Sequence, residues 1–585
     1  MYLDFTVKIP EGVPGITRKT LKGVTYIYYV HGRHYDPKKG YSVPSTTTIG
    51  KSIPGDPGSM YPNGNYLKFF PEIEIPEEKQ VKALRSGCIR TGAYLVIRKI
   101  ITQTGIDKIS DEVFGDDSGL FLDLAVYSIL TENNAGQYYP DYTYNHPLFT
   151  KGMRMYSDSK VSRFLGEHSA EQRILFQNSW NHLKKDRKKI YVSYDSTNKH
   201  CQAGDVELAE FGHEKNKQDK PILNYAIAYD SKNRDPLFYE DYPGSINDVT
   251  QLQIMLEKAK GYGYRDVGFI LDRGYFSEPN IHYMDRCGYE FIIMVKGMKD
   301  LVNELVLTYK GSFEQNRANS IRRYHVSGTT VQRQLFPSDE KKRYFHIYYS
   351  DRKHAAEREK VEEKIDKLGQ YMKDNQGKAL SLGSAFRKYF DLFYYHEGEP
   401  DEKFMAYREK TDVIDREISL CGYYVLITSE KMEASEALEL YKSRDTSEKL
   451  FRGDKSYLGN RCERTYTTES TETKILIEFA ALIVRSRIYT SLKDEVNRSK
   501  KKENYMTVPA ALRELEKIEM IRQPDGVYRL DYAVSATQKE ILKAFDMTAA
   551  NVREQASELG QQMQKAIAED VRTDMTEEEE ANGSW

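Results

Sequence analysis

The sequence predicts an α/β protein in which a mixed sheet is flanked by helices and smaller units are attached to it. Residues 188–300 alternate short apolar strands with helical stretches, and the same alternation resumes at 416–495. The 585-residue chain is also too long for one hydrophobic core. We therefore expect one domain divided by an insertion, and six units in all: 1–75, 76–187, 188–300, 301–415, 416–495 and 496–585.

The first two units differ in character. Residues 1–75 are rich in Gly, Pro and Tyr, and the stretches VTYIYYVHGRHYD and YSVPSTTTIGKSI read as strands broken by turns. Residues 76–187 have helical spacing, for example in DSGLFLDLAVYSILTE. The sequence predicts a small β-rich N-terminal unit followed by an all-helical one.

Strands and helices of the divided domain can be assigned in order. Expected strands are KIYVSYDST, two in NYAIAYDSKNRDPLFYEDYPG, VGFIL and YEFIIMV, with DVTQLQIMLEKAKGYG as a helix. The insertion mixes strand-like RRYHVSGTTVQRQLF and KRYFHIYYS with a highly charged helix at 351–374. The domain resumes with the strand CGYYVLITSE, a helix at 440–458 and an apolar helix at 474–489. The last unit reads as helix, hairpin and helix before an acidic, disordered tail.

Composition restricts the class of protein. The net charge of −2 gives no global signal for nucleic acid, so any phosphate-binding surface must be local. The basic run KKDRKK at 184–189 is a candidate for such a surface and is equally well explained as a solvated helix end. Five scattered cysteines indicate a reducing cytosol and no structural zinc. No signal-peptide pattern opens the sequence, and the longest apolar run, roughly 475–484, is too short to span a bilayer.

Two aspartates follow apolar strands of the divided domain. Asp195 ends the expected strand Ile190–Asp195, and Asp272 ends Val267–Leu271 before a Gly turn. Strand ends of this kind face the crevice where open α/β sheets bind ligands. Two neighbouring carboxylates repel each other unless a cation lies between them, and Mg²⁺ acting on a phosphate ester is the usual solution. Taken alone, each aspartate is more often a turn former or a helix cap.

A polar stripe follows in the helix at 440–458. Tyr441, Arg444, Glu448 and Lys455 fall on one face at 3.6 residues per turn. Such a face is either solvated, with Arg444 and Glu448 as an i,i+4 pair, or it meets a charged ligand.

These residues resemble the Y-R-E-K signature of one branch of the bacterial insertion-sequence DDE transposases. The blocks DSTN at 195–198, EFGHEKNKQDKPILNYAI at 210–227, YPGSINDVTQL at 242–252 and LDRGYFSEPNI at 271–281 are similar to the core blocks of that family and stand in the same order. The resemblance covers roughly 190–300 and 415–490.

The resemblance implies a ribonuclease-H-like core interrupted by an insertion ahead of the third carboxylate. Asp195, Asp272 and Glu448 would be the catalytic triad and would hold two Mg²⁺ ions, for which Mn²⁺ can substitute. Phosphates of the transposon end would be held by Tyr441, Arg444 and Lys455, and further DNA contacts are expected at Lys188, Lys189 and Lys296.

The implied partners are the terminal inverted repeats and the target DNA, bound by a homodimer in the bacterial cytoplasm at the nucleoid. The helical unit 76–187 is a candidate for DNA binding or dimerisation. Two alternatives stay open: a domesticated or inhibitory DNA-binding protein without catalysis, and a ribonuclease-H-like nuclease without strand transfer.

Overall fold

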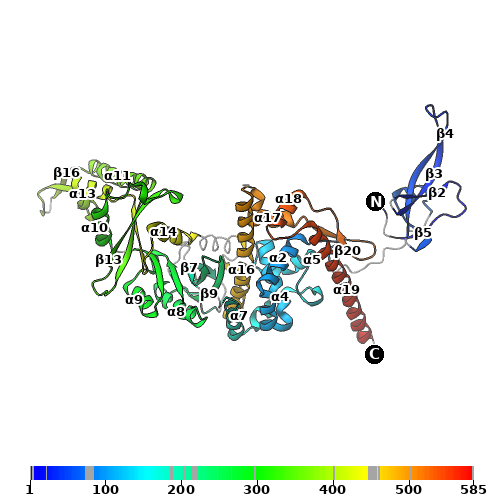
Figure 1. Ribbon diagram of the computed structural model, residues 1–585, viewed down its shortest axis with the longest axis horizontal. Coiled ribbons are helices and arrows are strands. Elements are labelled where there is room, and N and C mark those ends of the chain that lie inside the picture. Colours follow the sequence, from blue (N-terminus) through cyan, green and yellow to red (C-terminus); the bar gives the residue numbers. More distant parts are fainter. Residues whose placement is uncertain are drawn as a thin grey trace.

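The computed structural model describes the chain except residues 1, 3–4, 22, 54, 73–84, 185–186, 188, 202–205, 213–219, 247, 265, 296–297, 400–401, 446–456, 459–461, 501–502 and 583–585, with only the backbone described at 248–249 and 567–582. The units follow one another along an elongated molecule (Figure 1). The N-terminal β unit lies at one end, the helical unit and the central sheet follow, and the charged insertion helix lies at the other end. No helix among the described residues is long and apolar enough to cross a membrane.

The N-terminal unit is a five-stranded antiparallel sheet in the order β1-β5-β4-β3-β2, with one short helix against it. Ile27, Ile49 and Met60 share the face of the sheet that α1 covers, because strand residues alternate between two faces, and Tyr66 of α1 completes this small core. Its elements are β1 (Val7–Lys8), β2 (Ile16–Leu21), β3 (Val24–Asp36), β4 (Tyr41–Ile53), β5 (Asp56–Pro62) and α1 (Gly64–Phe69).

The helical unit is not closed on itself. Its residues share one hydrophobic core with the long helix α16 (Thr468–Ser499) and with the C-terminal elements. The segment is also not all helical as expected, because β6 (Cys88–Arg90) pairs with β19 (Glu519–Arg522), which pairs with β20 (Tyr528–Leu530). The helices are α2 (Gly92–Thr104), α3 (Ile106–Phe114), α4 (Ser118–Thr131), α5 (Tyr139–Asn145), α6 (Asp158–Glu167), α7 (Ala170–His182), α17 (Val508–Leu515) and α18 (Ala536–Lys543).

The acidic C-terminal residues differ from the expected disordered tail. Helix α19 runs over Ala549–Asn582 and so includes the run of glutamates. Glu, Ala, Gln and Met have high helix propensity, which favours continuation of a helix whose first turns already pack on the core through Val552, Ala556 and Leu559.

The central sheet is mixed and runs in the order β12-β13-β14-β17-β11-β10-β7-β8-β9, with β18 also paired to β7. Strands β7, β10 and β11 are parallel, whereas β8 and β9 follow β7 as antiparallel neighbours. The bounds are β7 (Ile190–Cys201), β8 (Ile222–Asp230), β9 (Asp235–Pro243), β10 (Val267–Leu271), β11 (Glu290–Met294), β17 (Tyr423–Thr428) and β18 (Cys462–Glu463).

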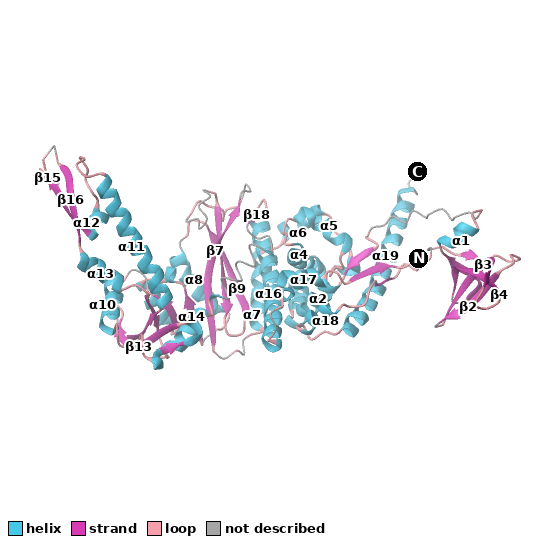
Figure 2. Ribbon diagram, turned by 90° about the horizontal axis from the view of Figure 1, so that it is seen from above, coloured by secondary structure: helices cyan, strands magenta, loops and turns pink. Residues whose placement is uncertain are grey.

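Helices cover both faces of this sheet. One face packs on α8 (Asp248–Gly261), α9 (Glu278–Cys287) and α10 (Lys299–Tyr309). The other face packs on α14 (Ala434–Lys442) over β10, β11, β14 and β17, and on α16 over β8 and β9. Figure 2 shows β7 and β9 beside α16 and α7, where the sheet meets the helical unit. The fold is thus a mixed sheet between layers of helices.

The insertion at 301–415 contributes to the sheet instead of standing apart from it. Strands β12 (Ser320–Ile321), β13 (Val326–Gln334) and β14 (Lys342–Tyr349) extend the sheet, because β14 pairs along its length with β17. A separate small core forms from the elements that follow, which project at the end of the molecule (Figure 1). These are α11 (Asp351–Asp374), α12 (Ser384–Tyr389), β15 (Phe390–Tyr395), β16 (Lys403–Glu409) and α13 (Thr411–Ser419).

Candidate active site

Asp195 and Asp272 are placed side by side by the pairing of two parallel strands. Leu271, the last residue of β10, pairs with Tyr194 of β7, so that Asp272 follows at the level of Asp195. Neighbouring strands lie about 4.8 Å apart, which brings the two aspartates within reach of one ligand. The strand pairing thus supplies the proximity that the sequence alone left open.

Asp195 does not end its strand, contrary to expectation. Strand β7 continues to Cys201, because β8 pairs with it through His200 and β18 pairs with His200 and Cys201. The polar residues after Asp195 suggested a turn, but continuous backbone pairing outweighs their weak strand propensity. Asp272 does follow its strand directly, as expected.

Both aspartates are on the α14 and α16 face of the sheet. Their neighbours Tyr194 and Leu271 are in the core on the opposite face, and successive strand residues alternate. Asp195 and Asp272 therefore lie between the part of the sheet that α14 covers and the part that α16 covers.

Helix α14 packs on the sheet by an apolar stripe. Ala434, Ala437, Leu438 and Tyr441 recur at helical spacing and contact residues such as Ile270 and Leu426. Tyr441 is 7% exposed, so it belongs to this stripe and not to a polar one. The helix ends at Lys442, and Arg444 stands in the turn that follows. Glu448 and Lys455 lie outside the described residues.

Arg444 connects this helix end to the carboxylates. Its Nη1 donates to Asp272 Oδ1 at 2.5 Å, and its guanidinium lies 5.1 Å from the centre of the Tyr441 ring. Burial of Asp272 acts to raise its pKa, but the hydrogen bond and charge of Arg444 outweigh burial and lower the pKa. Burial lowers the pKa of Arg444, and Tyr441, Asp272 and Asp195 together outweigh this and raise it. Asp272 is thus held ionised, and Arg444 stays charged.

The pair suits a hard divalent cation, which prefers carboxylate oxygens. Within the described part of the chain, no group of three or more His, Cys, Asp or Glu side chains could hold a metal ion. Asp195 and Asp272, two of the three expected ligands, follow neighbouring positions on paired strands. The third, Glu448, is among the residues not described.

Among the other expected DNA contacts, Lys189 is described and lies away from this site. Lys189 precedes β7 at the amino end of the sheet, roughly 20 Å along the strand from Asp195. Its Nζ forms ion pairs with Glu430, at 2.9 Å, and with Glu290. Although partial burial acts to lower it, the pKa of Lys189 is raised by these partners. Lys188 and Lys296 lie outside the described residues.

The rest of the basic run at 184–189 is also used internally where it is described. Lys184 is buried against the Trp180 ring and donates to the Trp180 carbonyl at 3.0 Å. Arg187 pairs with Asp230 at 2.7 Å and with Asp235. Neither expected role, a phosphate-binding surface or a solvated helix end, fits these residues.

A buried ionic cluster beside the site was not anticipated. Lys199, four residues beyond Asp195 on β7, contacts Glu463 at 3.2 Å and also Glu478 of α16. Lys474 lies 3.5 Å from Glu463. The cluster joins β7, β18 and α16 just after the segment that contains Glu448. Its one sequence signal was Glu478, a charge in the middle of the apolar run ILIEFAALIV.

Comparison with known proteins identifies the family. The family described as "Transposase DDE domain" matches residues 188–484, which is 297 of the 585 residues and extends from the start of β7 into α16. A search of curated proteins gives no match.

One solved structure, a cryo-EM structure of the piggyBac transposase synaptic complex with hairpin DNA, aligns with 80% of this chain and 82% of its own at 11% identity and a TM-score of 0.31. With its carboxylate pair on neighbouring strands, and with more than half of its length matched, the chain belongs to the transposase DDE domain family.

Proposed function

We propose that this protein is the DNA transposase of a bacterial insertion sequence. It cleaves phosphodiesters at the transposon ends and joins the freed 3′-hydroxyl to target DNA. The observation that carries the proposal is the pair Asp195 and Asp272 on neighbouring parallel strands, with Arg444 bonded to Asp272. Membership of the DDE family supports the same reaction class.

The strand arrangement supports a ribonuclease-H-like core. Three antiparallel strands, β9-β8-β7, are followed across the sheet by β10 and β11, both parallel to β7. In this arrangement the first and fourth strands in chain order are adjacent at the centre of the core. Those two strands carry the two aspartates.

Asp195, Asp272 and Glu448 would hold Mg²⁺, two ions in our proposal, with Mn²⁺ as a substitute. The metal would neutralise charge on the phosphoryl group and favour an ionised attacking oxygen. The chain's own part is to keep the carboxylates ionised and adjacent. Asp272 meets this need, because its pKa is lowered despite burial.

Arg444 would have a second task beyond Asp272. A guanidinium carries five N–H donors in a fixed plane, and one of them, on Nη1, donates to Asp272. Its planar fork suits a phosphate next to the scissile bond. The Tyr441 ring packs beneath it and would position it, while Lys455 would add a point charge. Lys189 is not included among these contacts, since Glu290 and Glu430 compensate its charge.

The decisive experiment replaces the carboxylates one at a time. Asp195→Asn, Asp272→Asn and Glu448→Gln should each abolish cleavage of a DNA duplex that carries the transposon end. The matched control is Asp266→Asn, an exposed aspartate at the amino end of β10, which should cleave normally. If a folded triad variant retains near-parental cleavage, the assignment of that residue is wrong.

The same assay separates the alternatives. A transposase should give both a nicked or cut end and a joined product when target DNA is added, and chelation of divalent cations should stop both. A nuclease without strand transfer should give the cut alone. A non-catalytic DNA-binding protein should give neither product while still retarding the end DNA. We further propose that paired ends are bound by a homodimer, which sedimentation with and without end DNA can establish.

A further inference from the structure

The N-terminal sheet carries a row of alternating lysines and tyrosines. Backbone pairing places Lys19 of β2 opposite Tyr26 of β3, Tyr26 opposite Lys51 of β4, and Lys51 opposite Tyr61 of β5. The four side chains therefore lie side by side across four strands, on one face of the sheet. Cross-strand pairing brings them together, since they are spread over 43 residues of sequence.

This row is on the outer face of the unit. The inner face carries the core residues Ile27, Ile49 and Met60 and is covered by α1. On the outer face, Lys19 is exposed, and Tyr26, Lys51 and Tyr61 are half-buried. Half-buried tyrosines present part of each ring to solvent, which a core position would not allow.

Further residues of the same kind surround the row. Tyr2 packs near Tyr26, with ring centres 6.4 Å apart, and Lys51 Nζ lies 5.4 Å from the Tyr2 ring and 5.6 Å from the Tyr61 ring. Lys19 Nζ lies 5.3 Å from the ring of Tyr28, the next outward-facing residue of β3. Lysines against tyrosine rings hold both in place before any ligand arrives. We name Tyr2, Lys19, Tyr26, Tyr28, Lys51 and Tyr61 the Lys–Tyr face.

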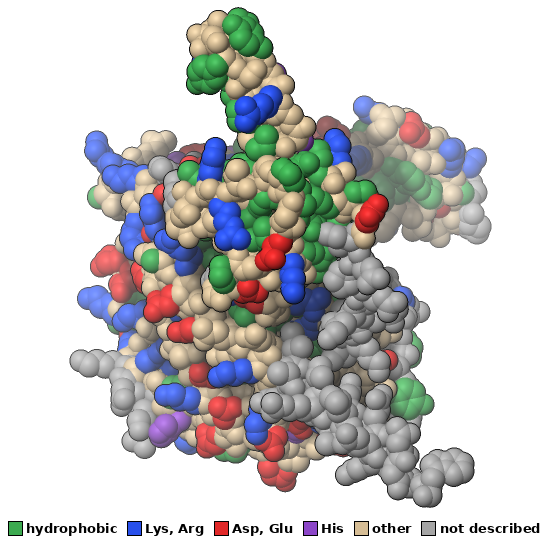
Figure 3. Space-filling model, turned by 90° about the vertical axis from the view of Figure 1, so that its right-hand side faces the viewer, with side chains coloured by type: hydrophobic (Ala, Val, Ile, Leu, Met, Phe, Trp, Pro, Cys, Tyr) green, Lys and Arg blue, Asp and Glu red, His purple; other side chains and the backbone are tan. Residues whose placement is uncertain are grey.

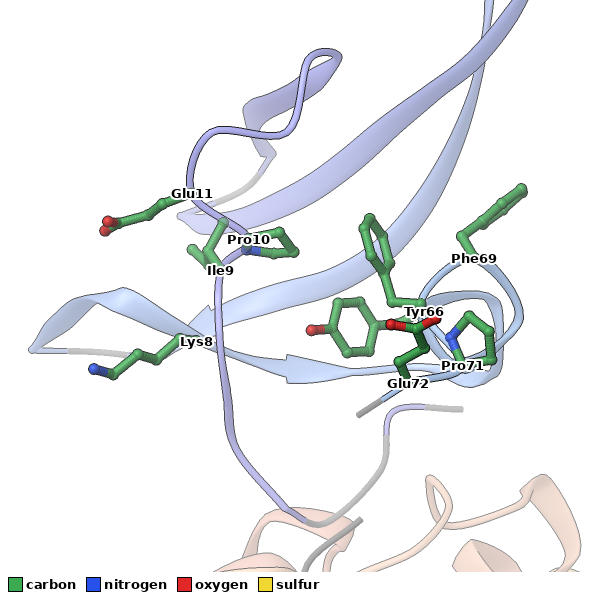
Figure 4. Close-up of a pocket in the computed structure, with 9 residues that line it drawn as sticks. Lys8, Ile9, Pro10, Glu11, Tyr66, Phe69, Pro71 and Glu72 are labelled. Atoms are coloured by element: carbon green, nitrogen blue, oxygen red, sulfur yellow. The ribbon is translucent and has the colours of Figure 1, made fainter. Parts of the chain in front are cut away.

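The described acidic residues of this unit are Glu11, Asp36, Asp56 and Glu72, and Asp56 begins β5, where its carboxylate accepts from the Gly58 amide. Glu11 and Glu72 line a cavity of about 600 Å³ on the α1 side, together with Lys8, Tyr66, Phe69 and Pro71 (Figure 4). Asp36 is at the turn of the β3–β4 hairpin, where it lies 3.9 Å from Lys39. The six residues of the Lys–Tyr face include two lysines and no acidic residue, which favours an anion on that face.

We infer that the Lys–Tyr face binds single-stranded DNA. Phosphates would be met by Lys19 and Lys51, while unpaired bases stack on the exposed parts of the tyrosine rings. That the ligand is DNA rests on the proposed function; that it is a strand with accessible bases follows from the aromatic content of the face.

Duplex DNA fits this surface less well. A duplex presents phosphates but buries the faces of its bases. The tyrosines would then add nothing to the binding that the lysines provide. A face that spans four strands is also too wide to enter the major groove, which admits one helix or a two-stranded ribbon. The neighbouring β3–β4 hairpin adds exposed His31, Arg33 and His34. Figure 3 looks onto this end of the molecule and shows Lys and Arg, Asp and Glu, and hydrophobic side chains interspersed below the projecting hairpin.

The test measures binding by the full chain in an Asp195→Asn background, which prevents cleavage. The probes are a 20-nucleotide oligothymidylate and a duplex of equal length without transposon sequence. Tyr26→Val/Tyr61→Val should weaken binding of the oligothymidylate on the order of tenfold or more and leave the duplex unchanged. Lys19→Gln/Lys51→Gln should lower the salt slope on the oligothymidylate by about 1.4.

Two controls keep the result interpretable. Lys38→Gln/Lys68→Gln removes the same charge from exposed positions outside the Lys–Tyr face and should leave the slope unchanged. Tyr26→Phe/Tyr61→Phe keeps the rings and should bind as the parent does, whether or not the Val variant folds.

The inference is overturned if the Val and Gln variants bind oligothymidylate like the parent. It is equally overturned if the Phe variant binds as weakly as the Gln variant, or if all losses are the same on duplex DNA. None of these outcomes depends on catalysis, so the proposed function can fail in the cleavage assay while this surface stands, and the reverse also holds.

Discussion

Replacing Lys199 by Met should destabilise the junction of β7, β18 and α16. The Lys199 side chain is fully buried, as are those of Glu463 and Glu478, which it contacts. Lys474 Nζ lies 3.5 Å from Glu463, and the Asn134 amide donates to Glu478 at 3.0 Å. Without Lys199, both buried carboxylates would lose the ammonium that contacts them.

The expected loss is about 3–5 kcal/mol, the usual cost of removing one partner from a buried ion pair. Lys199→Met/Glu478→Gln removes one charge of each sign and should cost less than Lys199→Met alone. The charges of Lys199 and Lys474 outweigh burial and hold the pKa of Glu463 below its ordinary value. Its stabilising contribution is therefore present above about pH 4.3 and is lost as the pH falls through the lowered folded-state pKa.

Urea unfolding followed by Trp180 fluorescence reports on the core that includes α16, because Trp180 is buried in that core and donates to the carbonyl of Pro236 on β9. The chain has two tryptophans, so a Trp585→Phe background isolates the signal. A loss below about 1 kcal/mol for Lys199→Met, or a double variant whose cost equals the sum of the single variants, would refute the account of a buried, coupled cluster.

Three further predictions concern separate parts of the fold. Burial lowers the pKa of His346 to about 4, so the folded state favours the neutral ring. The free energy of unfolding should therefore fall by up to about 3 kcal/mol as the pH drops from about 6.5 to 4. His346→Gln should flatten that part of the pH profile of the unfolding midpoint. Gly92→Ala would place a Cβ 2.4 Å from the Leu515 carbonyl and should lower the melting temperature by an amount equivalent to at least about 1–3 kcal/mol, whereas Gly261→Ala, with nothing within 4 Å, should not lower it. Arg444→Gln should weaken binding of end DNA and reduce its salt slope by about 1, while Asp272→Asn should keep binding and lose cleavage; an unchanged slope would remove Arg444 from the phosphate contacts.

Local periodicity in the sequence determined most elements of the divided domain. The strand Val267–Leu271, the helix that precedes it at 248–261, and the apolar helix α16 were all predicted from patterns within a few residues. Asp272 could be placed at a strand end for the same reason. Hydrophobic spacing is a local property, and it was sufficient for these elements.

The tertiary structure decided which elements meet. Pairing of β7 with β10 aligned Asp195 with Asp272, and β7 extends six residues beyond its expected end. Residues 76–187 share one core with the C-terminal elements. The tertiary structure also committed Lys189 to ion pairs with Glu290 and Glu430, although its charge had suggested a DNA contact. Strand register and ion pairing depend on residues far apart in the chain, which local patterns do not encode.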